Sequence, residues 1–320
     1  MTDLLIPRHL SMVQRRAKLK ALFFQMSRAN TLDEKLRAVI HDFDAGVLSG
    51  EHWEGNGLVV VVGESNSGKT REINRALKRF AEHTTKLECG RDVKFLQIAL
   101  DGETTWKALG LSVVREVGYE MTARKTEHEI WSQVRRQLER TGTWLIHIDE
   151  CQHMFETLGE KEARKVINSI KTFMKHRHWP VVVVLSGIND LLDKVNLDPQ
   201  FRNLMTAFHM GTINPMLDTD LDEVDTAFVG YAAAVGIVID QVRSEDIYRR
   251  LCYGHGNLFG RVFKFMVDLF ANLSPDCNEL TLEMLANRYG ARTGCMPGHN
   301  PFLREDYRAC DVDHLLAGVD

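Results

Sequence analysis

The stretch that decides the fold is Leu58–Thr70, which reads LVVVVGESNSGKT. Five aliphatic residues in a row are typical of a buried strand, and the eight residues that follow fit the pattern G-x-x-x-x-G-K-[ST]. In that pattern the glycines let the backbone turn tightly, so that successive N–H groups and the start of the next helix face phosphate groups. The stretch therefore predicts a nucleoside-triphosphate site built from a strand, a loop and a helix.

The residues of this loop have expected roles at the phosphates. Lys69 is expected to reach the β- and γ-phosphates of ATP, and the Thr70 hydroxyl is expected to bind Mg²⁺. A glycine-rich turn beside an unrelated lysine is the alternative, but such a turn needs neither a strand before it nor a helix after it. The remaining expected contacts with the nucleotide are Gly63, Glu64, Ser65, Asn66, Ser67 and Gly68.

A second chemical element lies at Thr143–His153, TWLIHIDECQH, where an aliphatic run ends in two acids. An aspartate at the end of such a strand, here Asp149, is the usual second partner of Mg²⁺ in proteins with a phosphate loop. A glutamate beside it, here Glu150, can orient and deprotonate an attacking water. Alone, this pattern is also typical of a capped helix start. Its position after the loop, with a strand and two helical stretches between, favours a site that hydrolyses the nucleotide.

Other aliphatic runs alternate with helical patterns, which predicts an α/β fold with a parallel five-stranded sheet and helices on both faces. The expected strands are 58–62, 93–100, 144–148, 181–185 and 207–213. Beyond about residue 240 only helical patterns remain, which predicts a small all-helical lid. The expected division is a helical N-terminal arm at 1–50, an α/β nucleotide-binding domain at 51–240, the lid at 241–293 and an extended C-terminal tail at 294–320.

Four further polar residues are candidates for the nucleotide site. The fourth strand is followed by Ser186 and Asn189, and either side chain could sense the γ-phosphate, although Asn189 could instead cap a helix. Arg202 stands just before the fifth strand, where an arginine can stabilise transition-state charge in a neighbouring subunit; a surface pair with Asp198 is the alternative. Arg261, near the start of a lid helix, could close onto the γ-phosphate or belong to a solvated helix face.

Composition restricts the class of protein. The 320 residues are 44% hydrophobic and 26% charged, which is ordinary for a globular chain and excludes a disordered or fibrous one. No apolar run approaches the ~20 residues of a membrane-spanning helix, and the N-terminus lacks the pattern of a signal peptide. We therefore expect a cytoplasmic protein with no membrane partner. Its six cysteines form no C-x-x-C pair and are expected to be reduced.

Together these residues resemble the AAA+ ATPases of transposition, the TniB/TnsC/MuB group, and TniB most closely. The resemblance rests on the phosphate loop, on Asp149-Glu150 followed by His153, on the turn Ser186-Gly187, and on the phrase Gly256–Arg261. Around Arg202 the chain departs from the family pattern, because the arginine stands two positions earlier than usual.

The resemblance implies a P-loop AAA+ (ASCE) fold and an ATPase that uses ATP and Mg²⁺. It also implies a homo-oligomer, either a ring or a helical filament, that assembles on double-stranded DNA and presents this target DNA to a DDE transposase. Hydrolysis of ATP would then disassemble the oligomer. A TniQ-type targeting protein is a further implied partner in some systems.

The net charge of −4 gives no overall attraction to DNA, so DNA binding would need a local basic patch. By resemblance, the segment after the second strand, here 101–126, lines the DNA channel; a solvated face with ordinary charge is the alternative. Trp106 in this segment can either contact a sugar edge or pack in the core. The candidate DNA contacts are Lys107, Arg115, Arg124 and Lys125.

Other classes of protein share the loop and the acidic pair. A signalling ATPase of the STAND type would need repeats or an effector domain, for which 320 residues leave little room. An origin-binding or helicase-loading ATPase would carry a DNA-reading module after the lid, and residues 294–320 are too short for a winged helix. A small-molecule kinase would not need Glu150 beside Asp149. Phosphate release measured with and without duplex DNA would separate most of these classes.

Overall fold

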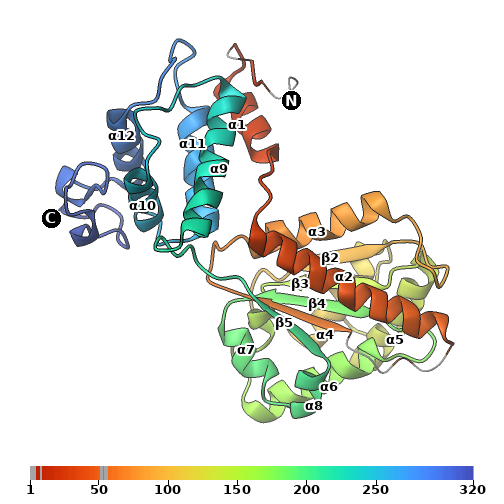
Figure 1. Cartoon of the computed structure of the whole chain (residues 1–320). Helices are drawn as coiled ribbons and strands as arrows, with labels where there is room; N and C mark the ends of the chain where they lie inside the picture. Colours follow the sequence, from red (N-terminus) through yellow and green to blue (C-terminus); the bar gives the residue numbers. More distant parts are fainter. Residues whose placement is uncertain (1–4, 8, 51–52, 54–56, 320) are drawn as a thin grey trace. The chain divides into compact units, whose positions relative to one another are not determined.

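The computed structural model describes the chain except residues 1–4, 8, 51–52, 54–56 and 320, and the chain divides into two units (Figure 1). The α/β unit is Ser27–Met210, and the helical unit joins Met1–Met26 to Gly211–Asp320. The chain therefore begins in the helical unit, builds the α/β unit, and returns to the helical unit.

A parallel sheet forms the centre of the α/β unit, which confirms the predicted fold class. Its strands are β1 Leu58–Val62, β2 Phe95–Ala99, β3 Leu145–Asp149, β4 Val182–Gly187 and β5 Met205–His209. They lie in the order β2-β3-β4-β1-β5, and every neighbouring pair is parallel. Because β4 alone separates β3 from β1, the carboxyl ends of these three strands lie together beside the phosphate loop (Figure 1).

Helices cover both faces of this sheet. One face is covered by α2 Ser27–Leu48 and α3 Lys69–His83, and the other by α4 Trp106–Glu116, α5 Glu127–Thr141 and α6 Glu160–Met174. Successive side chains of a strand point to opposite faces: Val59 and Val61 of β1 join the core under α2 and α3, whereas Val60 joins the core under α4, α5 and α6. The valine run is buried on both sides, which explains why it lacks polar alternation.

Several boundaries differ from those expected. Residues 27–48 belong to the α/β unit instead of an N-terminal arm, because the apolar face of α2 packs on the sheet. The fifth strand lies at Met205–His209 instead of 207–213, since the chain leaves the sheet after Met210, whose N–H donates to the Val62 carbonyl at 2.7 Å. Helix α9 Asp218–Val235 belongs to the helical unit instead of the α/β domain, because its main packing partners are helices of that unit.

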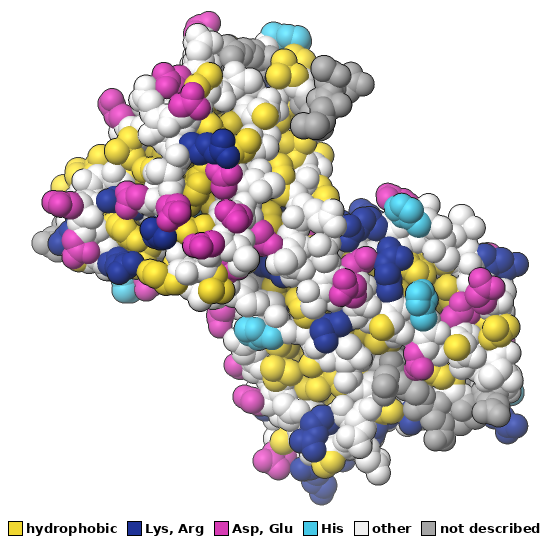
Figure 2. Space-filling model, in the orientation of Figure 1, with side chains coloured by type: hydrophobic (Ala, Val, Ile, Leu, Met, Phe, Trp, Pro, Cys, Tyr) yellow, Lys and Arg dark blue, Asp and Glu magenta, His cyan; other side chains and the backbone are white. Residues whose placement is uncertain are grey.

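Charged side chains are spread over the surface of both units in the view of Figure 2. On the face seen there, acidic side chains outnumber basic ones over the helical unit. None of the described helices is long and apolar enough to cross a membrane.

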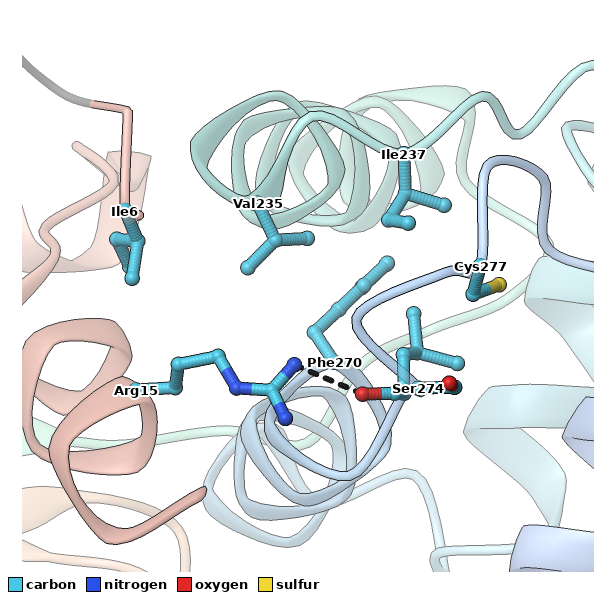
Figure 3. Close-up of a pocket in the computed structure, with 8 residues that line it drawn as sticks. Ile6, Arg15, Val235, Ile237, Phe270, Ser274 and Cys277 are labelled. Atoms are coloured by element: carbon cyan, nitrogen blue, oxygen red, sulfur yellow. Dashed lines mark hydrogen bonds between the residues drawn. The ribbon is translucent and has the colours of Figure 1, made fainter. Parts of the chain in front are cut away.

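A buried arginine anchors the first helix of the helical unit. The α-helices of this unit, among the described residues, are α1 Met12–Ala21, α9, α10 Glu245–Tyr253, α11 Phe259–Ala271 and α12 Leu282–Thr293. The guanidinium of Arg15 on α1 donates a hydrogen bond of 2.7 Å to the Leu273 carbonyl, which follows α11, and Figure 3 draws this bond as a dashed line from Arg15. The cavity beside it, about 10 Å³, has room for no more than one water. Arg16 pairs in turn with Asp268 of α11, so α1 is an integral part of the unit.

The C-terminal segment folds back onto the helical unit and does not form the expected extended tail. It contains two short 3₁₀ turns, η2 Pro297–His299 and η3 Tyr307–Ala309. Arg250 of α10 donates to the Pro301 carbonyl at 2.7 Å, and the ring of Phe302 stacks on Phe265 with ring centroids 6.2 Å apart. The prolines and glycines that predicted an extended chain instead make the turns that bring Phe302 into the core.

Replacing Phe302 by alanine is expected to lower the free energy of unfolding of the helical unit by roughly 3–5 kcal/mol, because the change leaves a cavity beside Phe265. The ring is 2% exposed, whereas the neighbouring Leu303 is 54% exposed, so Leu303→Ala is the matched control and should change stability by less than about 0.5 kcal/mol. Urea denaturation followed by circular dichroism measures both. Equal effects of the two substitutions would contradict the packed position of Phe302.

Candidate nucleotide-binding site

The phosphate loop connects β1 to α3 in a conformation that requires its glycines. Gly68 has φ +98° and Asn66 has φ +64°, both in the left-handed region. A Cβ at Gly63 would lie only 2.6 Å from the Met210 carbonyl oxygen, so no larger residue fits there without a shift of the backbone. The loop leads directly into the N-terminus of α3, which favours negative charge.

Lys69 lies inside this loop. Its side chain is 5% exposed, and Nζ donates to the carbonyls of Gly63 and Glu64 at 2.8 and 2.9 Å. Burial lowers the pKa of the ammonium, while the carboxylates of Glu150, Asp149 and Glu64 oppose that shift. A buried cation whose hydrogen bonds within the described part of the chain go to carbonyl oxygens is well placed to receive an anionic ligand such as a triphosphate.

Thr70 and Asp149 meet at the start of α3 and the end of β3. The Thr70 hydroxyl donates to Oδ2 of Asp149 at 2.5 Å. Hydroxyl and carboxylate oxygens are the ligands that Mg²⁺ prefers in proteins, so this pair fits the ion that the sequence implies.

Glu150 follows Asp149 with φ +55°, a strained conformation for a residue other than glycine. Its N–H donates to Oδ1 of Asp149 at 3.0 Å, and its carboxylate accepts a hydrogen bond of 2.7 Å from Nε2 of Gln152. The side-chain oxygen Oε1 of Gln152 accepts a hydrogen bond from the Ile188 N–H at 3.3 Å. Gln152 therefore connects the expected base to the end of β4, a role that the sequence analysis did not identify.

Two buried polar side chains support Asp149: His147, two residues earlier on β3, and Ser186 on the neighbouring strand β4. Ser186 Oγ is 2.5 Å from Asp149 Oδ1 and 2.7 Å from His147 Nε2. Both side chains are essentially inaccessible to solvent, and burial lowers the pKa of His147 to about 4. The other candidate for sensing the γ-phosphate, Asn189, reaches the loop itself: its Nδ2 donates to Oε1 of Glu64 at 3.0 Å, and its side chain makes no helix-capping bond.

A further basic residue at the loop comes from α2. Nη1 of Arg28 donates to the Ser67 carbonyl at 3.0 Å. Nothing local in the sequence marks Arg28, because the helix that carries it was expected in a separate arm. Its position adds a second positive charge beside Lys69.

Two candidates for the nucleotide site remain, one in each unit. Arg202 is exposed on α8 Pro199–Asn203 and forms no ion pair with any described residue; Asp198 instead pairs with Lys171 at 2.7 Å. Arg261 lies in the first turn of α11, in the helical unit, with its guanidinium close to Gly256.

The candidate DNA contacts lie on α4 and on the segment that joins it to α5. Lys107 is half-buried, whereas Arg115 and Arg124 are exposed. Lys125 is exposed but pairs with Glu129 at 3.1 Å, which reduces its net charge. Trp106 stacks on Trp131 with ring centroids 3.9 Å apart and is 9% exposed, so it packs in the core.

The sheet order and the phosphate loop give this chain the fold of an AAA+ ATPase. Cdc6p from Pyrobaculum aerophilum is similar over 82% of this chain and 67% of its own, with a TM-score of 0.57 and 14% identity. ORC2 from Aeropyrum pernix, in ADPNP–ADP complexes, covers 79% of this chain and 66% of its own with a TM-score of 0.55 and 14% identity. The Walker-type ATPase paby2304 of Pyrococcus abyssi is similar over 86% of this chain and 73% of its own, with a TM-score of 0.53 and 13% identity.

The chain belongs to the TniB family. The model of the bacterial TniB protein matches residues 23–214, a region that holds the phosphate loop, the acidic pair and α2. No curated protein matches this sequence.

Proposed function

We propose that this chain is an ATPase that binds ATP together with Mg²⁺ and hydrolyses it. The observation that carries the proposal is the meeting of Lys69, Thr70, Asp149 and Glu150 at one edge of the sheet, with the Thr70 hydroxyl and the Asp149 carboxylate 2.5 Å apart. Membership of the TniB family and the AAA+ fold support the same activity.

In the proposed reaction the loop N–H groups and Lys69 hold the β- and γ-phosphates. Thr70 and Asp149 would hold Mg²⁺, which neutralises charge on the phosphates. Glu150 takes a proton from the attacking water, and its hydrogen bond with Gln152 orients the carboxylate for that step.

The proposed cellular role is that of a transposition regulator. With ATP bound, copies of the chain would assemble as a ring or filament on duplex DNA, deliver that DNA to a DDE transposase, and disassemble after hydrolysis. A TniQ-type targeting protein is a second proposed partner. The family supports this role through its association with transposition.

Phosphate release from ATP, measured with the full chain with and without duplex DNA, tests the proposal. We expect release that needs Mg²⁺ and changes when DNA is added, and negative-stain images with an ATP analogue should show rings or filaments on DNA. Binding of ATP without turnover would indicate a nucleotide-gated scaffold. ATP hydrolysis at a rate that does not change when DNA is added would favour a signalling ATPase.

Removal of the candidate DNA contacts is expected to weaken binding about equally across DNA sequences, because phosphate contacts carry no sequence information. For Lys107→Ala, and for Arg124→Ala combined with Lys125→Ala, the slope of log K against log salt should flatten by about 0.9 per lost phosphate contact. Fluorescence anisotropy of labelled duplexes at several salt concentrations measures this. Lys78→Ala, an exposed lysine on α3, is the control. An unaltered slope in both variants would place the DNA surface elsewhere.

Arg202→Ala is expected to bind ATP normally but to hydrolyse it slowly, because an arginine that completes a neighbour's site acts on the transition state. Mixing this variant with Lys69→Ala should restore part of the activity, since some interfaces then combine an intact loop with an intact arginine. Phosphate release from the mixture, compared with each variant alone, is the measurement. A mixture no faster than the two variants separately would argue against action between subunits.

A further inference from the structure

Four side chains form a continuous line of hydrogen bonds that runs from the interior to the phosphate loop. His147 Nε2 lies 2.7 Å from Ser186 Oγ, which lies 2.5 Å from Asp149 Oδ1; the opposite oxygen of Asp149 accepts from Thr70 at 2.5 Å. Three of the four are buried: His147 is 1%, Ser186 0% and Asp149 6% exposed. Only Thr70 faces the open side of the loop.

The direction of these bonds follows from the number of protons available. A carboxylate can only accept hydrogen bonds, so the single proton of the Ser186 hydroxyl points to Asp149. Ser186 Oγ must then accept from His147, which therefore carries its proton on Nε2. Nδ1 of the same ring is buried and has no hydrogen-bond partner among the described residues, which is what an imidazole with its one proton on Nε2 would show.

We infer that His147 is a positioning residue for the metal carboxylate: through Ser186 it fixes the orientation of Asp149 toward the ion. The inference rests on the proposed binding of ATP with Mg²⁺. Removing a residue that donates a hydrogen bond to a metal-binding carboxylate, without itself binding the metal, typically lowers metal affinity by about 10–100-fold. The position of His147 supports this role, because its neighbours on the same face of the sheet, Leu145 and the cross-strand Val184, are apolar and buried, and a polar ring there costs stability unless it is hydrogen-bonded.

A corollary separates the two candidates for sensing the γ-phosphate. The Ser186 proton is committed to Asp149, so this hydroxyl has no proton to donate to a phosphate. Asn189 contacts the loop through Glu64 and keeps a second amide proton for the nucleotide. Asn189 is therefore the residue that should distinguish ATP from ADP.

The test is the Mg²⁺ dependence of nucleotide binding, measured with a fluorescent ATP analogue that is not hydrolysed. The midpoint of this dependence is the Mg²⁺ concentration that gives half of the full increase in affinity for the analogue. His147→Phe keeps an aromatic ring and removes the donor, and it should raise this midpoint by about 10-fold or more. Affinity in EDTA should stay unchanged. His147→Gln places an amide N–H close to the position of Nε2 and should restore the wild-type midpoint to within about threefold. Ser186→Ala should shift the midpoint by a similar factor, and the double variant no further, because the two residues act through one line of bonds.

A matched control is available in His255, another buried histidine whose pKa is lowered to about 4 by burial. It lies in the helical unit and bonds the Leu251 carbonyl, so His255→Phe should leave the Mg²⁺ midpoint unchanged. Thermal unfolding of each variant shows whether it folds. If His147→Phe does not fold, the Ser186→Ala and His147→Gln variants still test the inference. A wild-type midpoint in His147→Phe would overturn the inference and leave the proposed function intact. Failure of the wild-type chain to bind the analogue would instead overturn the proposed function.

Discussion

Lys69→Ala is expected to weaken ATP binding at least about 100-fold. Lys69 is the buried cation of the phosphate loop, and removing one member of a buried charge pair typically costs about 3–5 kcal/mol, where about 1.4 kcal/mol is tenfold in affinity. The carbonyls of Gly63 and Glu64, which accept from its Nζ, would also lose their donor and repel the triphosphate. Titration with a fluorescent ATP analogue measures the loss.

Lys78→Ala is the control for this change. Lys78 lies on the same helix, α3, but is exposed and away from the loop, so its removal should leave ATP affinity within about twofold, since surface substitutions are nearly neutral. If Lys69→Ala bound ATP as tightly as Lys78→Ala, the loop would not be the phosphate site.

Glu150→Gln is expected to bind ATP as well as the unaltered chain and to hydrolyse it about 100-fold more slowly or worse, the usual contribution of a general base. The substitution keeps the length of the side chain but removes its basicity, while Thr70 and Asp149 remain to hold the ion. Single-turnover phosphate release and analogue binding, measured side by side, separate the two effects. Because disassembly is proposed to follow hydrolysis, assemblies of this variant on DNA should also last longer.

Glu156→Gln provides the comparison. Glu156 is an exposed carboxylate a few residues after Glu150, and among the described residues its side chain bonds only His153. The Glu156→Gln variant should therefore hydrolyse ATP at the normal rate. Normal turnover in Glu150→Gln would remove Glu150 from the mechanism and direct attention to another base.

The sheet and the phosphate loop could be predicted from the sequence because their signals are local. The run Leu58–Val62 marks a strand buried on both faces, and the glycines after it are needed by the left-handed turn that Gly68 makes. The alternation of strands and helices leaves few arrangements other than a parallel sheet. The fifth strand was misplaced because the apolar residues beyond His209, such as Met210 and Ile213, are buried although they follow the end of the strand.

The supporting residues of the site could not be predicted, because their partners are distant in sequence. His147 meets Ser186 and Gln152 meets Ile188 only when β3 and β4 pair, and Arg28 meets Ser67 only when α2 packs on the sheet. The folded C-terminal segment was missed for a similar reason: its proline and glycine content describes the turns but not the ring of Phe302 that they bury. Local patterns find a ligand-binding loop more readily than the contacts behind it.

The return of the chain to its first unit has a consequence for biogenesis. Helix α1 leaves the ribosome before the whole of Ser27–Met210, yet Arg15 and Leu19 are buried by residues that follow this unit. At the usual rate of synthesis, about 5–20 residues per second, the roughly 250 residues from α1 to Leu273 take roughly 13–50 s, and α1 waits that long for its partners. During that interval its apolar side is available to chaperones, or to the helical unit of a neighbouring nascent chain on the same messenger. Exchange of α1 between two chains is therefore the misassembly to which this order of synthesis exposes the protein.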